Sequence, residues 1–339
     1  MKEIIIVGHG LAGAILAHTL IDRGLKVSCS EGKINYSASR IATGLINPFI
    51  GPKLNIPFEF KRCTEVNFHF FKKWEEESNE ILLKPEPLLR VFKSKTQRNK
   101  WDEYTKNSDS SRYTLSFHSR EKLAESEIMG KYGAGETHAF RLNVEKFLQL
   151  SRQKLESMDC WREETFKHTH IKDNDSVFFA EGYNVSNNPY FNWLPFAPSQ
   201  GEILEFTGPE SNALSNGTWF LPNKKSSFLA GSTWKHTELK SGPTKIGHDT
   251  ILRNLDYMPT SRYKKVNHYS GIRSGTLDRN PIIGQHPRLD NLYIFNGFGS
   301  RGSTTIKLYA DHLAELFING VKLPKHVDLK RFCSLLPNI

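Results

Sequence analysis

The chain has 339 residues, of which 38% are hydrophobic and 24% are charged. This is the composition of an ordinary globular protein, and it excludes extensive disorder. No apolar run approaches the ~20 residues that span a bilayer, and the apolar N-terminus is broken by glycines, so we expect a cytoplasmic protein without membrane contact. The formal net charge of +10 favours anionic partners. A nucleic-acid partner is compatible with this charge but is not favoured, because the sequence contains no long basic run.

The cysteines and histidines do not form a metal-binding pattern. Cys29, Cys63, Cys160 and Cys333 are scattered without Cys-x-x-Cys spacing, which indicates reduced thiols. The sequence 168-His-Thr-His-170 alternates as a strand would and has no third ligand at metal spacing, so we predict no metal site. The hydrolase and zinc-enzyme motifs Gly-x-Ser-x-Gly and His-Glu-x-x-His are also absent from the sequence.

The first thirteen residues predict a dinucleotide-binding loop. An apolar strand, Ile4–Val7, leads into Gly8-x-Gly10-x-x-Gly13 and then into a helix. In this motif Gly8 makes the sharp turn, Gly10 lets the backbone approach a pyrophosphate, and Gly13 lets the helix pack on the sheet. The first helical N–H groups, at Leu11 and Ala12, then face the phosphates at the positive end of the helix dipole.

A second strand, Leu25–Ser30, is followed directly by Glu31, eighteen residues after Gly13. This is near the spacing of roughly 20 residues at which a carboxylate meets a ribose hydroxyl. Glu31 is therefore predicted to bind the ribose and to disfavour a 2′-phosphate.

The middle of the chain alternates between helical and irregular patterns. Residues 34–48 are rich in small and turn-forming residues and predict neither a helix nor a strand. Helices are predicted at 59–77 and at 143–158, where Asn143 is the cap, and a buried strand is predicted at 176–180. The composition shift over 78–130 suggests an inserted region.

The last part of the chain is predicted to contain a group of antiparallel strands followed by a strand and a helix. Period-two patterns at 202–207, 218–222 and 227–233 predict antiparallel strands. A strand at 291–295, a glycine-rich turn and an amphipathic helix at 303–318 then return to the opening pattern. The C-terminus is therefore expected to complete the dinucleotide-binding domain.

Together with the N-terminal loop, several segments resemble the FAD-dependent D-amino-acid oxidase superfamily, which includes glycine and sarcosine oxidases. The segments that carry the resemblance are Ser39–Gly44, Ala180–Gly182, Pro198–Glu202, Gly271–Gly284 and Asn296–Gly302. The resemblance implies an α/β fold in which a Rossmann-like FAD-binding domain of the glutathione-reductase type carries an inserted α+β substrate domain with an antiparallel sheet. We expect residues 1–77, 140–190 and 266–339 to form the FAD-binding domain, and 78–139 and 191–265 to form the substrate domain.

The resemblance also implies which residues hold FAD. The predicted cofactor-binding residues are Gly8, Gly10, Leu11, Ala12, Gly13, Glu31, Ser39, Arg40, Thr43, Gly44, Gly182, Gly299, Ser300, Arg301, Gly302 and Ser303. The turn at 299–303 can offer N–H groups and a helix dipole to the pyrimidine oxygen of a reduced flavin. The alternative interpretation of this turn is an ordinary strand-to-helix connection.

Two arginines are the predicted catalytic residues. In the family, an arginine in the Gly-x-Arg setting of Arg273 binds the carboxylate of the amino acid in a bidentate manner. A structural ion pair is the alternative role for Arg273. Arg301 is a second cation near the flavin ring, while Asp278 and Arg279 are expected to fix the loop.

Several positions depart from the family pattern. Ile41 stands where histidyl-linked members have His, and no Cys lies between 297 and 320, so noncovalent FAD is expected. Ser274 replaces the usual proline after Gly-x-Arg, and Glu181 replaces a small residue. Both departures weaken any transfer of substrate identity.

The function implied is oxidation of the C–N bond of a small amino acid or secondary amine by hydride transfer to FAD. The segments at 44–48 and 299–302 also resemble the oxidase half of the bifunctional enzyme that modifies the wobble uridine of bacterial tRNA, which is the alternative enzymatic function. A flavin-binding protein without turnover is the non-enzymatic alternative. The substrate, the electron acceptor and the oligomeric state are not predicted.

Overall fold

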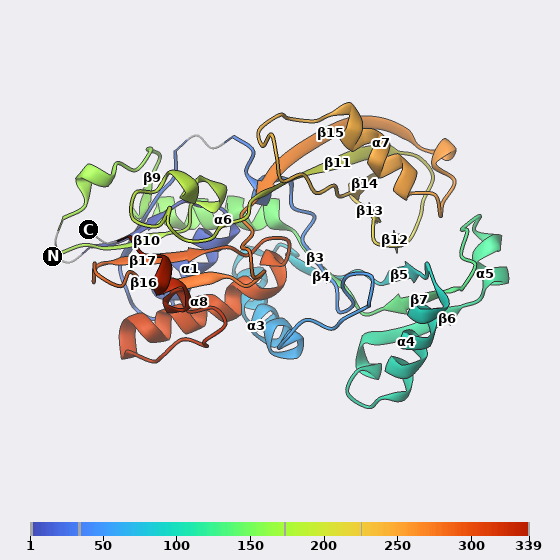
Figure 1. Cartoon of the computed structure of the whole chain (residues 1–339), viewed down its shortest axis with the longest axis horizontal. Coiled ribbons are helices and arrows are strands. Elements are labelled where there is room, and N and C mark those ends of the chain that lie inside the picture. The colour runs from blue at the N-terminus through green and yellow to red at the C-terminus, as the bar shows by residue number, and fades with distance from the viewer. Residues whose placement is uncertain (1–2, 33–34, 173, 225, 338–339) are drawn as a thin grey trace.

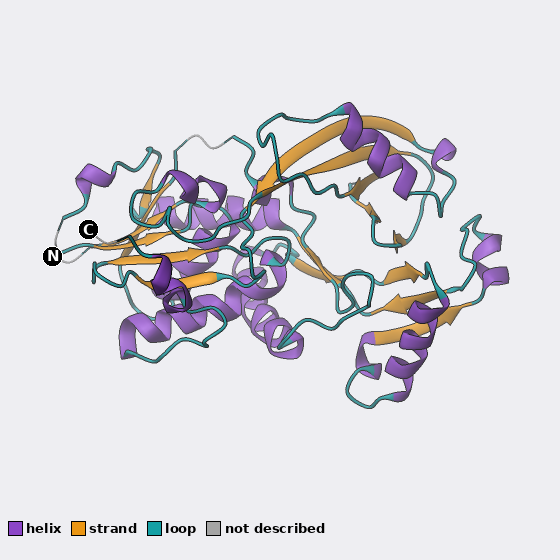
Figure 2. Cartoon of the chain, viewed as in Figure 1, coloured by secondary structure: helices purple, strands orange, loops and turns teal. Residues whose placement is uncertain are grey.

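The computed structural model describes residues 3–32, 35–172, 174–224 and 226–337. A six-stranded and an eight-stranded sheet lie toward opposite ends of an elongated molecule, with a small third sheet between them (Figure 1). Helices pack mainly around the six-stranded sheet (Figure 2). No helix in the described ranges is both long and apolar enough to cross a membrane.

The six-stranded sheet is mostly parallel and has the first strand near its centre. Its strands, in spatial order, are β16 (Ile282–Gln285), β17 (Leu292–Asn296), β10 (Ser176–Phe179), β1 (Ile4–Val7), β2 (Val27–Ser30) and β9 (Trp161–Arg162). Only β16 runs antiparallel to its neighbour within this sheet. Ile4 pairs with Ser176 on one side and with Val27 on the other. The strands are apolar along their length because both faces of a parallel sheet are covered.

Four helices cover this sheet. They are α1 (Leu11–Ile21), α3 (Phe60–Ser78), α6 (Val144–Ser157) and α8 (Gly302–Asn319). α1 packs against both α6 and α8, and α3 packs on α8. Because α1 is enclosed in this way, nearly all of its residues are buried, which its small and aliphatic composition allows.

The eight-stranded sheet combines two distant parts of the chain. Its strands, in spatial order, are β15 (Lys264–Arg273), β11 (Ser199–Thr207), β14 (Ser227–Gly231), β13 (Trp219–Pro222), β12 (Ala213–Ser215), β5 (Leu88–Val91), β7 (Ala134–Thr137) and β6 (Thr114–His118). β12 and β5 are parallel, and the other pairs are antiparallel. α7 (Lys245–Asn254) packs on β11, and α4 (Lys95–Lys106) and α5 (Arg120–Glu125) belong to the region around β5 and β6.

The small sheet connects the two large ones. It consists of β3 (Leu45–Ile46), β8 (Phe140–Leu142) and β4 (Leu83–Pro85). From β8, the Arg141 guanidinium donates to the carbonyl oxygen of Thr43 at 2.9 Å and to that of Pro222 on β13. Short 3-10 turns complete the fold at Ser111–Tyr113, His168–His170, Gly182–Asn187, Thr260–Arg262 and Leu329–Leu335.

Most of the predicted elements are confirmed within one or two residues. The Asn143 side chain caps α6 by accepting from the Lys146 N–H at 3.1 Å, as expected. Two expectations were wrong. Residues 34–48, of which Ile34 lies outside the described residues, contain a one-turn helix, α2 (Ala38–Ile41), and the strand β3, because the segment gains its hydrogen bonds from β15 and β8. Residues 168–170 form a 3-10 turn and no strand.

A buried polar network lies beneath the N-terminal loop. The Ser151 hydroxyl on α6 lies 2.7 Å from Nε2 of His9 and 2.9 Å from Nε2 of His18. A hydroxyl can donate to one neutral ring and accept from the other. Burial lowers the pKa of His9 to about 3 and that of His18 to about 4, so both rings are neutral in the folded protein.

This network makes stability depend on pH in a defined direction. In the unfolded chain each histidine takes up a proton as the pH falls below its ordinary pKa of about 6.5, whereas the folded protein does not. The free energy of unfolding is therefore expected to fall by on the order of 2–4 kcal/mol between pH 7 and pH 5. Urea unfolding at pH 7, 6 and 5 measures this. His18→Gln is expected to make the fall in unfolding free energy smaller. The control His69→Asn, at an exposed position, is expected to leave it unchanged. An equal fall in the wild type and both variants would contradict the assignment of His18 as a neutral buried histidine.

Candidate active site

The predicted dinucleotide loop has the close contacts that its glycines require. Gly8 has a φ of +98°. A Cβ placed on Gly13 would lie 1.8 Å from the Gly8 carbonyl oxygen, so only glycine allows α1 to approach the loop this closely. Gly10 has more space around it, because the atom nearest to an added Cβ is the Ser39 hydroxyl oxygen at 3.1 Å.

The segment around α2 closes over this loop. The Leu11 N–H, in the first turn of α1 beside Ala12, donates to the Ser39 hydroxyl at 3.0 Å. Arg40 lies 3.9 Å from the Glu31 carboxylate at the end of β2. Burial raises the pKa of Glu31, and the Arg40 charge opposes that shift. The structure thus brings the predicted phosphate-binding and ribose-binding residues together at the carboxyl ends of β1 and β2.

Thr43 and Gly44 lie at the entry to the small sheet. Gly44 has a φ of +72°, and a Cβ there would lie 1.8 Å from the Leu142 carbonyl oxygen. The Thr43 carbonyl accepts from Arg141. The structure therefore gives both residues a role in joining α2 to β8, in addition to any contact with a cofactor.

Gly182 follows β10 beside the N-terminal loop. Its φ is +58°, and its carbonyl accepts from Asn296 Nδ2 at 2.9 Å, which joins the ends of β10 and β17. Burial raises the pKa of its neighbour Glu181 to about 7, and that carboxylate accepts from Asn188 Nδ2 at 2.7 Å.

The turn at 299–303 begins α8 as predicted. Gly299 has a φ of +56°, and its N–H donates to the Ser274 carbonyl at 2.8 Å. Ser300 is exposed, and Gly302 is the first residue of the helix. Asn67 on α3 fixes the turn by donating to the carbonyl of Ser303 at 3.1 Å.

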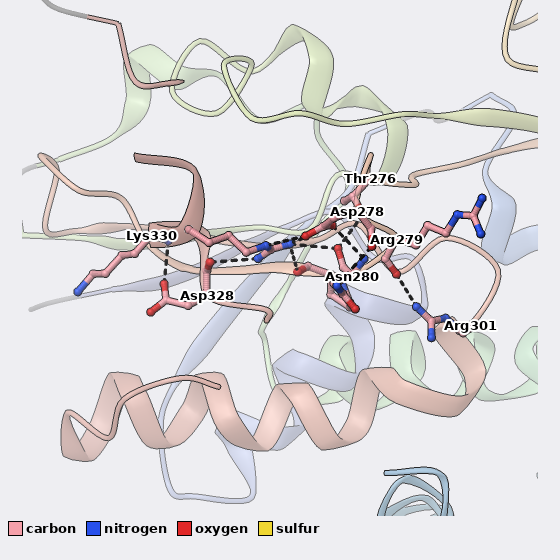
Figure 3. Close-up of polar contacts among 9 residues, drawn as sticks. Thr276, Asp278, Arg279, Asn280, Arg301, Asp328 and Lys330 are labelled. Carbon is pink, nitrogen blue, oxygen red and sulfur yellow. Dashed lines mark hydrogen bonds and ion pairs between the residues drawn. The ribbon is translucent and has the colours of Figure 1, made fainter. Parts of the chain in front are cut away.

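Arg301 lies at the start of α8, but its guanidinium is engaged by the neighbouring loop. It donates to the carbonyl oxygen of Arg279 (Figure 3). The same loop is held by an ion pair between Asp278 and Arg331 at 2.9 Å. In this arrangement Arg301 and Asp278 both hold the loop that connects β15 to β16.

Arg273, at the end of β15, lies in a different environment. Its Nη1 donates to the Thr233 carbonyl at 3.2 Å and its Nη2 to the Ser232 hydroxyl at 2.6 Å. Its Cζ lies 4.3 Å from the centre of the Trp234 ring. Burial lowers the pKa of Arg273 to about 10. No carboxylate of the described residues forms an ion pair with it, so its charge is balanced only by neutral acceptors and an aromatic ring.

A cavity of about 110 Å³ lies next to this region. Tyr183, Phe196, Pro198 and Ser274 are among the residues that line it. The Ser274 hydroxyl is buried and has no hydrogen-bond partner within the described ranges. A buried polar group of this kind calls for a partner supplied by a ligand or by water.

Sequence reasoning missed the residues that surround Arg273. Ser232, Thr233 and Trp234 follow β14 and carry no motif. The available signal was an aromatic residue three positions after a strand that ends at Gly231. The four cysteines are all free, and no cluster of three or more potential ligands for a metal exists among the described residues.

Comparison with known proteins identifies the family. The model of the FAD dependent oxidoreductase (DAO) family matches residues 3–316, so the chain belongs to this family. FAD is the cofactor of the family. The glycine loop, the acid at the end of β2 and the unpartnered Ser274 hydroxyl fit this group.

Curated relatives match part of the chain. Glycine oxidase of Pseudomonas aeruginosa is 24% identical over 129 residues, which is 36% of this chain and 35% of the relative. The tRNA 5-methylaminomethyl-2-thiouridine biosynthesis bifunctional protein MnmC of Leptospira borgpetersenii is 26% identical over 203 residues, which is 48% of this chain and 31% of the relative. The matched segments thus span about a third of the length of each relative.

The fold is that of a solved glycine oxidase. The structure of this enzyme from Geobacillus kaustophilus has a TM-score of 0.78 and 18% sequence identity, with 100% of both chains covered. At this identity the likeness establishes the α/β fold with its parallel and antiparallel sheets, as predicted.

The two loop glycines are expected to respond differently to an added methyl group. Gly13→Ala should destabilise the protein by about 3 kcal/mol or more, because its Cβ overlaps the Gly8 carbonyl. Gly10→Ala should fold with little loss of stability, because its φ of −72° suits alanine, but should bind FAD weakly, because the methyl group enters the space of the pyrophosphate. Thermal unfolding of the apoprotein and flavin titration separate the two effects. If Gly10→Ala binds FAD with normal affinity, the pyrophosphate does not lie against Gly10.

Proposed function

We propose that this protein oxidises the C–N bond of a small amino acid or secondary amine, with FAD as the hydride acceptor. The observation that carries the proposal is the Arg273 guanidinium, which is largely buried, cationic and without a carboxylate partner among the described residues. Removing a charge from water without a counter-ion is costly, and a substrate carboxylate supplies the counter-ion. The planar guanidinium suits this role better than an ammonium group would.

The cofactor is proposed to bind noncovalently. Ile41 packs on Gly271 at the position of the histidyl linkage, and the sequence has no Cys between 297 and 320. The proposed contacts are the predicted set of Gly8, Gly10, Leu11, Ala12, Gly13, Glu31, Ser39, Arg40, Thr43, Gly44, Gly182, Gly299, Ser300, Arg301, Gly302 and Ser303. Ser274 is added to this set because its hydroxyl has no partner within the described ranges.

Bound FAD would supply the acceptor for the hydride from the α-carbon of the amine. The residues of the chain position the substrate. Ser232 and Thr233 hold one side of the Arg273 guanidinium, so its remaining N–H groups are fixed in direction before substrate binds. The N-terminus of α8 places a positive dipole end beside Gly299 and favours negative charge there.

The division into domains is also a proposal, and strand pairing supports a modified boundary. β5, β6 and β7 join the sheet of β11–β14, which supports placing 78–139 with 191–265. The boundary at residue 266 falls inside β15, which pairs with β11 along its whole length. We therefore place the boundary after Arg273.

The tRNA-directed oxidase remains the alternative, favoured by the match to MnmC and by the net charge of +10. Both functions place a carboxylate on Arg273, and they differ in the size of the substrate.

A cytoplasmic location is proposed from the four free cysteines, because thiols stay reduced in that compartment.

Anaerobic mixing tests the proposed function. The purified holoprotein is mixed with glycine, sarcosine, other amino acids or undermodified tRNA, and the flavin absorbance is followed. Bleaching by small amines is the expected result. Bleaching only by tRNA would favour the alternative, and a flavin that no candidate reduces would indicate a binding protein.

Substitution of Arg273 tests the role of its guanidinium. Arg273→Ala is expected to lower kcat/KM for the amine at least 100-fold while FAD remains bound, because the loss of a charge-assisted bidentate contact costs roughly 3 kcal/mol. Arg273→Lys should restore only part of the activity. Arg253→Ala removes an exposed charge from α7 and serves as the control. Loss of flavin from Arg273→Ala without a specific catalytic effect would assign Arg273 a structural role.

A further inference from the structure

Trp234 is the most exposed aromatic side chain near the proposed carboxylate site. It is 58% exposed, although it lies next to the partly buried Arg273. No other aromatic ring packs on it within the described ranges. One side of the indole meets the guanidinium, and much of the remaining ring surface is left to solvent.

The guanidinium of Arg273 is enclosed between backbone and indole. A Cβ on Gly201 would lie 2.1 Å from Arg273 Nη2, so the guanidinium occupies the space above this glycine on β11. Trp234 lies at cation–π distance from the same group. Arg273 and Trp234 therefore form one unit, and a group attached to a carboxylate on Arg273 comes next to the indole.

Buried residues of β11 hold the loop that carries Trp234, and Gln200 makes contacts near both of its ends. Gln200 is 0% exposed. Its Nε2 donates to the Gly242 carbonyl at 2.8 Å, and its Oε1 accepts from the Lys240 N–H at 3.0 Å. Its backbone N–H donates to the Lys235 carbonyl at 2.8 Å. Because Gln200 fixes both ends of the loop, the indole has a defined position without substrate, which reduces the ordering cost of binding.

We propose that Trp234 determines substrate specificity by stacking with a planar ring of an amine whose carboxylate lies on Arg273. The inference rests on the proposed function and narrows its substrate class to glycine-type amines that carry an uncharged aromatic ring. Ring stacking on an indole contributes beyond simple area burial. A cationic substituent does not suit this position, because the Arg273 guanidinium repels it.

The test compares two secondary amines that share a carboxylate and differ in one ring, N-benzylglycine and sarcosine. Their kcat/KM values are measured by anaerobic flavin reduction with the holoenzyme. The wild type is expected to favour N-benzylglycine by about tenfold, which corresponds to stacking of about 1.4 kcal/mol. Trp234→Ala should bring this ratio to about one, whereas Trp234→Phe should keep most of it. A merely structural role for Trp234 would lower both values equally and leave the ratio unchanged.

A binding measurement separates this inference from the proposed function. Phenylacetate and acetate are titrated while the flavin spectrum and the tryptophan fluorescence are recorded. Tighter binding of phenylacetate that Trp234→Ala abolishes supports the stacking site even if neither amine reduces the flavin. Equal binding of the two carboxylates, or a preference that Trp234→Ala retains, would overturn the inference whether or not amines are oxidised.

Discussion

The proposed substrate site is organised around a guanidinium that has no carboxylate partner in the described part of the chain. Arg273 donates to the Ser232 hydroxyl and the Thr233 carbonyl, and neither carries a negative charge. In a folded protein, a buried cation without a counter-ion raises the free energy of the folded state, because the cation loses hydration and gains no ion pair in return. Two hydrogen bonds and the Trp234 ring compensate in part for the lost hydration of the guanidinium. The charge balance of the apoprotein therefore favours the proposed binding of an anion at this point.

The rest of the structure maintains the surroundings of this charge. Gly201 leaves room for the guanidinium, and β11 and β15 pair along their full lengths, so the position of Arg273 is set by a rigid sheet. Arg141 and the small sheet then tie this sheet to the α2 segment, which also contacts the N-terminal loop through Ser39. These contacts link the glycine loop to the sheet that carries Arg273.

The sequence predicted well those structural features that depend on local sequence and on short motifs. The glycine loop, the end of β2 before Glu31, the cap at Asn143 and the C-terminal helix each depend on residues close together in the sequence. Arg273 was found only through the family resemblance, because a lone arginine in a strand has no distinctive spacing. Trp234, Gln200 and the pairing of β5 with β12 were not predicted, because each depends on contacts between segments far apart in sequence. The one-turn helix at 38–41 was missed for the same reason, since β15 supplies a partner for Ser37 beside it.

The pairing of β1 has a consequence for how the protein is made. Ile4 has Ser176 as a neighbour, and β10 in turn pairs with β17, which begins at Leu292. β1 can pair with β2 early, but its other edge has no partner until more than half of the chain has been translated. Such long-range pairings slow folding and leave apolar strands unprotected in the meantime. The central strand of the six-stranded sheet therefore gains both of its neighbours only after the middle of the chain has emerged.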